Sequence, residues 1–162
     1  MATELLLIRH GQSEANVGLS DHPDCGLTPT GYEQARQMGR RLRRHDLSGF
    51  AGLTSPYQRT LATASEIAAA TGLSFEVEEG IREWGNLATI NGREYPMESV
   101  EHLIERLGGF LRRYEGRRII VVSHAAPIAV LTQLAWGETP NTHDQFWTGV
   151  ANCCLRWLIA PG

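Results

Sequence analysis

The chain has few cysteines and no long hydrophobic run, and both absences narrow the class of protein. Its three cysteines, Cys25, Cys153 and Cys154, are an odd number without CxxC spacing, a poor basis for a disulfide framework or a thiolate metal site. The longest apolar stretches, around Glu4–Ile8 and Ile119–Val122, have the length of strands, whereas a membrane helix needs roughly 20 residues. We therefore expect reduced cysteines with a packing role and no membrane-spanning segment.

The chain also lacks an excess of positive charge. Its formal net charge is -3 and its pI is near 6.1. Contact with a phosphate backbone usually needs clustered Lys and Arg, so we expect no nucleic-acid partner and only a local positive site. Met1 leads directly into the apolar run at Glu4–Ile8 without the basic opening of a secretion signal, which predicts a cytoplasmic protein.

No internal repeat, low-complexity tract or flexible linker divides the sequence. A length of 162 residues with 42% hydrophobic content suits one compact domain with its own core. We therefore expect a single catalytic domain over residues 1–162.

Strand-like and helix-like segments alternate along the chain. The expected strands are Glu4–Ile8, Phe50–Thr54, Ser74–Val77, Arg118–Ser123 and Val150–Ile159. The expected helices are Pro29 to about Arg44, Gln58–Ala70, Met97 or Ser99 to about Tyr114, and Ala126–Ala135. The stretch Glu78–Glu98 has little periodicity and is interpreted as a loop region. This order predicts an α/β fold, a three-layer α/β/α sandwich with a mostly parallel central sheet of about five to six strands.

Four side chains that are common in catalytic sites follow expected strands. His10 and His124 come directly after apolar strands, and Arg59 and Glu83 lie shortly after two others. Ligands of such folds bind beyond the carboxyl ends of the strands, so we expect these residues to share one site. The segment 17–26 and the loop region 78–98 are expected to shape its rim.

The residue types at this edge are suited to a phosphoryl group. Its transfer passes through a state whose charge is spread over three oxygens, so positioned positive donors favour it. Arg9 and Arg59 supply permanently charged donor forks, and a neutral imidazole at His10 is a ready nucleophile. Gly11 allows the backbone to approach phosphate oxygens, and the turn towards Asn16 adds polar donors.

The remaining histidines and the tryptophans carry no matching motif. We expect surface positions for His22, His45, His102 and His143. A zinc site at His22 and Cys25 lacks a second ligand pair, and a pocket rich in arginine repels a cation, so we expect no metal and no cofactor. The tryptophans expected to pack in the core or at its margins are Trp84, Trp136, Trp147 and Trp157, and Trp84 is also placed to stack against a substrate.

The segment Leu7–Asn16, with the sequence Leu-Ile-Arg-His-Gly-Gln-Ser-Glu-Ala-Asn, resembles the opening signature of the histidine phosphatase superfamily, the phosphoglycerate-mutase-like proteins. Three further blocks, Leu27–Ala35, Ser55–Ala64 and Val121–Ile128, resemble later blocks of that family in the family's order. The four blocks cover most of the chain, and together they make the resemblance specific to a short, insertion-poor member.

The resemblance implies a role for each site residue. His10 would take the phosphoryl group, while Arg9, Arg59 and His124 would form the rest of the phosphate pocket. Asn16 would line its rim. Ala125 is assigned to the same pocket, although relatives often have glycine there.

The family's general acid is a glutamate after the third strand, and Arg82–Gly85 resembles that segment. Glu83 would therefore protonate the leaving oxygen and then activate water, which one carboxylate can do because both groups use the same side of phosphorus.

We expect a metal-independent phosphatase that acts on a phosphate monoester or a phosphorylated protein through a phosphohistidine. The interval between Glu83 and His124 is shorter than in the sugar-phosphate mutases, which favours hydrolysis. Three alternatives stay open: a phosphoglycerate-mutase-type phosphotransferase, a phosphohistidine-protein phosphatase, and a non-catalytic phosphate-binding module. The sequence indicates neither which phosphorylated small molecule or phosphoprotein is the substrate nor the oligomeric state.

Overall fold

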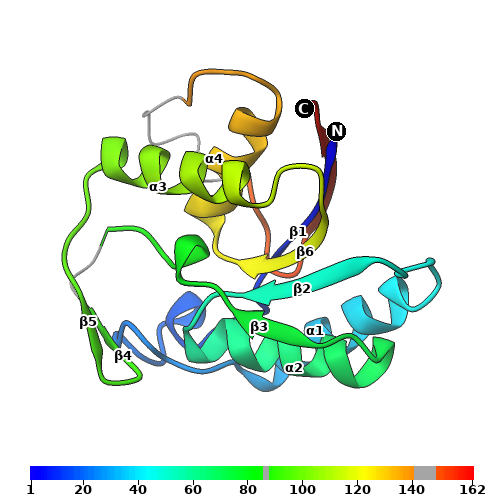
Figure 1. The fold of residues 1–162 in the computed structure, drawn as a ribbon. Coiled ribbons are helices and arrows are strands. Elements are labelled where there is room, and N and C mark those ends of the chain that lie inside the picture. The colour runs from blue at the N-terminus through cyan, green and yellow to red at the C-terminus, as the bar shows by residue number, and fades with distance from the viewer. Residues whose placement is uncertain (86–87, 141–148) are drawn as a thin grey trace.

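The computed structural model describes residues 1–85, 88–140 and 149–162, and places a central sheet between two layers of helices (Figure 1). The sheet strands are β1 (Thr3–Arg9), β2 (Phe50–Thr54), β3 (Phe75–Val77), β6 (Arg118–Ser123) and β7 (Leu155–Ala160). Their order is β3-β2-β6-β1-β7, parallel throughout except for β7, which runs antiparallel to β1. The predicted α/β/α sandwich with a mostly parallel sheet is confirmed.

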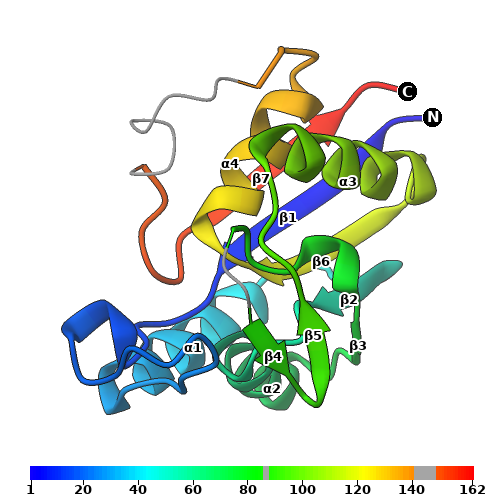
Figure 2. The same ribbon diagram turned by 90° about the vertical axis from the view of Figure 1, so that its left-hand side faces the viewer.

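Helices cover both faces of this sheet (Figure 2). On one face lie α1 (Pro29–Leu42) and α2 (Gln58–Thr71), and on the other α3 (Val100–Arg113) and α4 (Ala125–Ala135). Strands buried on both faces read as continuous apolar runs, which is how the parallel sheet is recognisable in the sequence.

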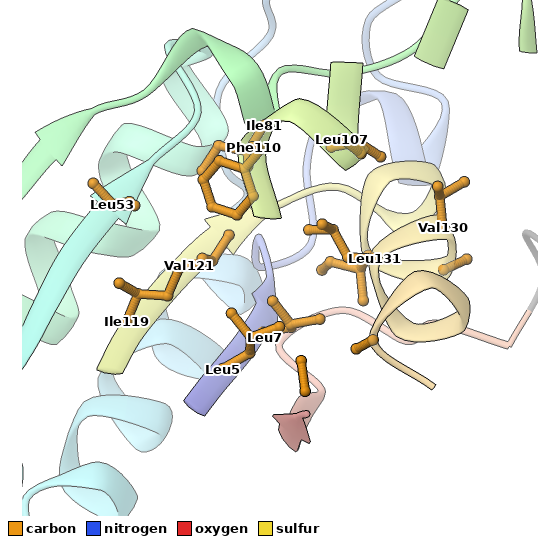
Figure 3. Close-up of a cluster of buried hydrophobic side chains, with 14 of the residues drawn as sticks. Leu5, Leu7, Leu53, Ile81, Leu107, Phe110, Ile119, Val121, Val130 and Leu131 are labelled. Atoms are coloured by element: carbon orange, nitrogen blue, oxygen red, sulfur yellow. The ribbon is translucent and has the colours of Figure 1, made fainter. Parts of the chain in front are cut away.

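The central strands divide their side chains between two hydrophobic clusters. Ile119 and Val121 of β6 face the α3 and α4 layer, where Leu107 and Phe110 of α3 pack against them (Figure 3). The intervening residues of β6 join the cluster beneath α1 and α2 instead. Because neighbouring strand residues point to opposite faces, one short run contributes to both cores and fixes the register of the strand.

Polar caps set the starts of two helices. At α1, the backbone N–H of Gly31 donates to the Thr28 hydroxyl over 3.1 Å, and Pro29 occupies the first turn as predicted. At α3, the backbone N–H of His102 donates to Oγ of Ser99 over 3.1 Å. Ser99, and not Met97, is therefore the residue that begins this helix.

The interpretation of residues 78–98 as a loop region is wrong in part. The segment contains a short 3₁₀ turn, η2 (Glu79–Ile81), and an antiparallel hairpin of β4 (Ala88–Ile90) and β5 (Arg93–Tyr95) beside the main sheet (Figure 1). Asn91 and Gly92 join the two strands, and both have positive φ, 53° and 77°. An Asn-Gly pair in this conformation is a strong hairpin signal, and the sequence contains it.

The last strand begins five residues later than the expected Val150. Residues 151–154 form a turn, in which Cys153 has a φ of 50° and its backbone N–H donates to the carbonyl of Arg9 over 3.1 Å. Cys153 and Cys154 therefore do not alternate across a strand. Both are half-buried, Cys25 is buried, and all three are free thiols.

The packing prediction fails for Trp136, which is 61% exposed. Trp157 lies at the margin of the core, as predicted: it is 42% exposed on the edge strand β7, its ring meets that of buried Phe50 edge-on at 6.4 Å between centres, and its indole N–H donates to Glu4. Trp84 does pack against the larger core cluster, and Trp147 lies outside the described residues. No helix in the described ranges is both long and apolar enough to cross a membrane.

Candidate active site

The carboxyl ends of the parallel strands bring the predicted site residues together. Arg9 ends β1, His124 follows β6, and Arg59 lies in the first turn of α2 after β2. A cavity of about 710 Å³ opens at this edge. Its lining includes the predicted residues Arg9, His10, Asn16, Arg59, Glu83 and Ala125.

The rest of the lining comes mainly from segments 13–16, 21–23, 84–85 and 97–98, which we call the rim. The expectation that segments 17–26 and 78–98 would shape the rim is therefore confirmed. Trp84 is among the lining residues, as its stacking role requires.

Hydrogen bonds fix the tautomer of His10. Its Nδ1 lies 2.7 Å from the carbonyl oxygen of Gly11, and a carbonyl can only accept, so Nδ1 carries the proton. Nε2 then keeps its lone pair, which accepts a hydrogen bond from Nε of Arg59 over 3.3 Å. The backbone N–H of Gly11 donates to Thr63 of α2 over 3.0 Å and holds this arrangement in place. Of the two ring nitrogens, Nε2 is therefore the one that carries the lone pair.

Gly11 serves a packing contact in addition to its carbonyl bond. A Cβ built there would lie 2.4 Å from the carbonyl oxygen of Gly31 in α1, closer than real atoms approach. The structure thus requires glycine at this position because the loop passes close to α1. That the backbone of Gly11 also approaches a phosphate stays a prediction.

Arg59 is held on several sides. It is 8% exposed, its NH1 donates to the carbonyl of Pro23 over 2.8 Å, and its guanidinium lies 4.7 Å from the centre of the Tyr57 ring. Its NH2 lies 3.6 Å from Oε2 of Glu83. A planar fork fixed in this way is a preorganised donor set for an anion.

Arg9 offers a donor that no described residue uses. Its NH1 donates to the carbonyl of Val150 over 2.6 Å. Its Nε is buried and has no hydrogen-bond partner among the described residues. Buried polar groups are almost always satisfied, so an orphaned charged donor beside His10 points to a bound anion.

His124 is fully buried directly behind the cavity. Its Nε2 shares a hydrogen bond of 2.8 Å with the hydroxyl of Ser55, and its ring meets that of His10 edge-on at 5.3 Å between centres. Its Nδ1 lies 3.3 Å from Oε2 of Glu83. Our sequence reasoning missed Ser55, although it ends β2 at the same sheet edge and opens one of the matching blocks.

Glu83 lines the cavity beside Arg59 and His124. One carboxylate oxygen accepts from its neighbouring backbone N–H at Trp84 over 2.9 Å, and the other faces Arg59 and His124. Burial raises the pKa of this carboxyl, and the Arg59 charge only partly opposes the shift. An upward shift of the pKa is the direction that favours a general acid, because the carboxyl then holds its proton more tightly.

The segment that carries Glu83 is tied to α3. Arg106 donates from NH1 to the carbonyls of Gly80 over 2.8 Å and Arg82 over 3.2 Å. Its NH2 donates to Glu98 over 2.6 Å. Our sequence reasoning missed this contact because an arginine within an amphipathic helix gives no sign of which backbone it reaches.

Burial keeps both histidines neutral. It lowers the pKa of His10 to about 3, with the Arg59 charge adding to the shift, and lowers the pKa of His124 well below its usual value for the same reasons. At pH 7 the Nε2 atom of His10 therefore carries no proton.

This shift predicts a pH dependence of stability. The folded pKa of about 3 lies below the usual 6.5, so the unfolded chain binds more protons and the folded state loses stability as pH falls below about 6.5. For His10 alone, we expect a loss of about 2 kcal/mol in the free energy of unfolding between pH 7 and pH 5. Urea titrations in phosphate-free buffer would measure it. The loss should be smaller by that amount in His10→Gln, and equal losses in both proteins would contradict the prediction.

Asn16 and Ala125 complete the predicted set. Oδ1 of Asn16 accepts from the backbone N–H of Ser13 over 3.0 Å and from Asn152 over 3.1 Å, which leaves its amide N–H group to bind a ligand. Ala125 begins α4, where the first backbone N–H groups have no partner within the helix. Such a helix start favours an anion.

Within the described ranges, no group of three or more His, Cys, Asp or Glu side chains is arranged to hold a metal ion. His22, His45 and His102 are exposed, as expected. His143 lies outside the described residues.

The doubly wound sheet and the arginine and histidine side chains at its carboxyl edge define the class of phosphoryl-binding α/β enzymes. The chain belongs to the histidine phosphatase superfamily (branch 1), whose family model matches residues 5–96 and 86–160. The family resemblance read from the four blocks is thus confirmed.

Two relatives illustrate the range of named activities. The chain is 30% identical over 175 residues to a protein named uncharacterized phosphatase PhoE of Bacillus subtilis (strain 168), covering 94% of this chain and 86% of the relative. It is 28% identical to a 2,3-bisphosphoglycerate-dependent phosphoglycerate mutase of Methylobacterium sp. (strain 4-46), and this match covers 90% of this chain and 88% of the relative. These relatives support a phosphatase or a phosphoglycerate-mutase-like phosphotransferase.

Among solved structures, a putative alpha-ribazole-5'-P phosphatase from Escherichia coli superposes with a TM-score of 0.78. The match covers 98% of this chain and 91% of that one at 22% sequence identity. At this identity the likeness shows the fold.

Proposed function

We propose that the protein is a metal-independent phosphatase that hydrolyses a phosphate monoester through a phosphohistidine at Nε2 of His10. The observation that carries the proposal is the fixed tautomer of His10, whose lone pair faces the guanidinium of Arg59 beside the orphaned Nε of Arg9. In the free protein the Nε–H of Arg59 occupies that lone pair. A bound phosphoryl group provides a better acceptor for it and releases Nε2 for attack.

In the first step, the Nε2 lone pair forms a bond to phosphorus while the bond from phosphorus to the leaving oxygen breaks. The proton of the Glu83 carboxyl moves to that oxygen, so the alcohol leaves neutral. Arg9 and Arg59 hold the three phosphoryl oxygens. The imidazole becomes positively charged, and its Nδ1–H donates to the carbonyl of Gly11, which stabilises the charge.

In the second step, the Glu83 carboxylate takes a proton from a water molecule whose oxygen attacks phosphorus. The bond between Nε2 and phosphorus breaks, the imidazole regains its lone pair, and inorganic phosphate leaves. Glu83 is again protonated, so the cycle closes without a further reactant.

Hydrolysis is favoured over mutase chemistry because water can reach the site. The side chain of Glu83 is 25% exposed at the open cavity, whereas a mutase must shield its phosphoenzyme from water. The two functions differ in one measurement. A phosphatase releases inorganic phosphate from a series of monoesters at neutral pH with a chelator present, whereas a mutase isomerises a phosphoglycerate primed by its bisphosphate. Activity that disappears with the chelator would contradict the metal-independent mechanism.

Glu83→Gln should reveal the general acid through its dependence on the leaving group. With an alkyl phosphate, whose alkoxide is a poor leaving group, we expect kcat to fall about 10²- to 10³-fold, because no proton reaches the oxygen. With p-nitrophenyl phosphate the loss in the first step should stay below about tenfold, since nitrophenolate leaves without a proton. The burst of nitrophenol in rapid-quench experiments measures that step alone.

Equal losses for both esters would assign Glu83 a positional role. A small loss confined to phosphohistidine peptides, which release a good leaving group, would favour the alternative of a phosphohistidine-protein phosphatase. Glu66→Gln is the matched control, because Glu66 lies on α2 and pairs with Arg36 at the surface.

A further inference from the structure

The rim of the cavity differs in charge from the phosphoryl pocket that it surrounds. Arg9 and Arg59 are the arginines in the described lining, and both are committed to the phosphoryl group. The charged rim residues that line the cavity are acidic, Asp21 and Glu98. Any group attached to the phosphate therefore meets negative side chains.

The two rim carboxylates are not equivalent. The side chain of Glu98 is 3% exposed and is neutralised by Arg106 at 2.6 Å and Arg82 at 3.4 Å. Asp21 is exposed, and no residue in the described ranges forms an ion pair with it. Asp21 is thus the rim charge that a substrate encounters.

In the described ranges, no lysine or arginine pairs with Asp21. The neighbouring His22 accepts a hydrogen bond at Nδ1 from the backbone N–H of Asp24 over 3.0 Å, so this nitrogen is engaged elsewhere. The undescribed residues 86–87 and 141–148 contain neither lysine nor arginine in their sequence. They have no permanent cation to contribute.

The rim also offers apolar surface and room. Met97 is 75% exposed, and Trp84 and the buried Tyr57 contribute aromatic carbon to the lining. The cavity volume of about 710 Å³ is in the range that holds an organic ligand and exceeds the need of a phosphoryl group.

We propose that the substrate is a phosphate monoester whose alcohol part is neutral or positively charged and partly apolar, and that Asp21 discriminates against a carboxylate or a second phosphate on that part. The inference rests on the proposed phosphatase function and narrows its substrate. A second anion gains no cationic partner from the described rim and lies near Asp21, an unpaired carboxylate, which raises the free energy of its bound state.

A matched series of aryl phosphates tests the proposal: 4-(hydroxymethyl)phenyl, 4-(carboxymethyl)phenyl and 4-(aminomethyl)phenyl phosphate. The methylene group keeps the acidity of the three phenols similar, so kcat/KM reports the charge alone. We expect the carboxylated ester to be at least tenfold poorer than the hydroxylated one, and the amino ester to equal or exceed it. Equal values for all three, or preference for the carboxylate, would overturn the proposal.

Asp21→Arg identifies the residue responsible. This substitution should reduce the preference against the carboxylated ester at least threefold, and it should lower kcat/KM for the amino ester. Glu138→Arg is the matched control, since it makes the same charge change on an exposed residue beyond the far end of α4, roughly 16 Å of helix from the site. If both variants change the preference equally, the effect comes from the net charge of the protein, and the proposed role of Asp21 is contradicted.

Failure of this inference is distinguishable from failure of the proposed function. If none of the three esters is hydrolysed and no phosphoenzyme forms, the phosphatase proposal fails. If all three are hydrolysed at the same rate, the phosphatase proposal stands and the charge preference alone is overturned.

Discussion

His10→Gln is expected to lower kcat by roughly 10⁴-fold or more and to abolish the phosphoenzyme. Loss of a covalent nucleophile removes the whole two-step route, and such losses are among the largest that single substitutions cause. Glutamine keeps a neutral polar group opposite Arg59, so the pocket stays paired. Steady-state release of phosphate measures the first effect, and acid-labile phosphate retained by the protein after rapid denaturation measures the second.

The control for this substitution is His45→Gln, because His45 is exposed near the opposite end of β2. Its activity should stay within about twofold of the parent. Since His10 is buried, thermal unfolding and binding of inorganic phosphate should be measured for His10→Gln as well. A folded variant that binds phosphate but retains more than a tenth of the activity would contradict a phosphohistidine at this position.

The sequence predicts the parts of the site that follow strands. Arg9, His10 and His124 come directly after buried apolar runs, and parallel strands present their carboxyl ends at one edge. Their approach to one another therefore follows from the fold class. The contacts that hold these residues in place do not follow from the fold class, because Ser55 and Arg106 bind residues that are distant in the chain.

The errors in the fold have a common physical origin. The hairpin of β4 and β5 is too short for a hydrophobic period to develop, so only its Asn91-Gly92 turn marks it. At the other end, Cys153 lies in an apolar run that looks like a strand, but its backbone N–H bonds to the end of β1 and forces a turn. Local sequence patterns cannot predict such long-range hydrogen bonds.

Arg59→Lys should have the second largest effect, a loss of about 3 kcal/mol in transition-state stabilisation, or roughly 10²-fold in kcat/KM. A lysine keeps the charge but has one donor centre in place of the fork that reaches His10, Pro23 and Glu83 together. It also loses the planar contact with the Tyr57 ring. The expected loss therefore comes from geometry, since the charge is conserved.

A matched substitution separates these two causes. Arg40→Lys makes the same change at the surface of α1, where Arg40 pairs with exposed Glu33 over 2.7 Å, and activity should stay within about twofold. If Arg59→Lys keeps more than a third of the parental kcat/KM, charge alone suffices and the guanidinium fork is not the transition-state donor. A full loss restored neither by higher substrate concentration nor by lower ionic strength would place the effect in kcat, where a donor that acts mainly in the transition state must appear.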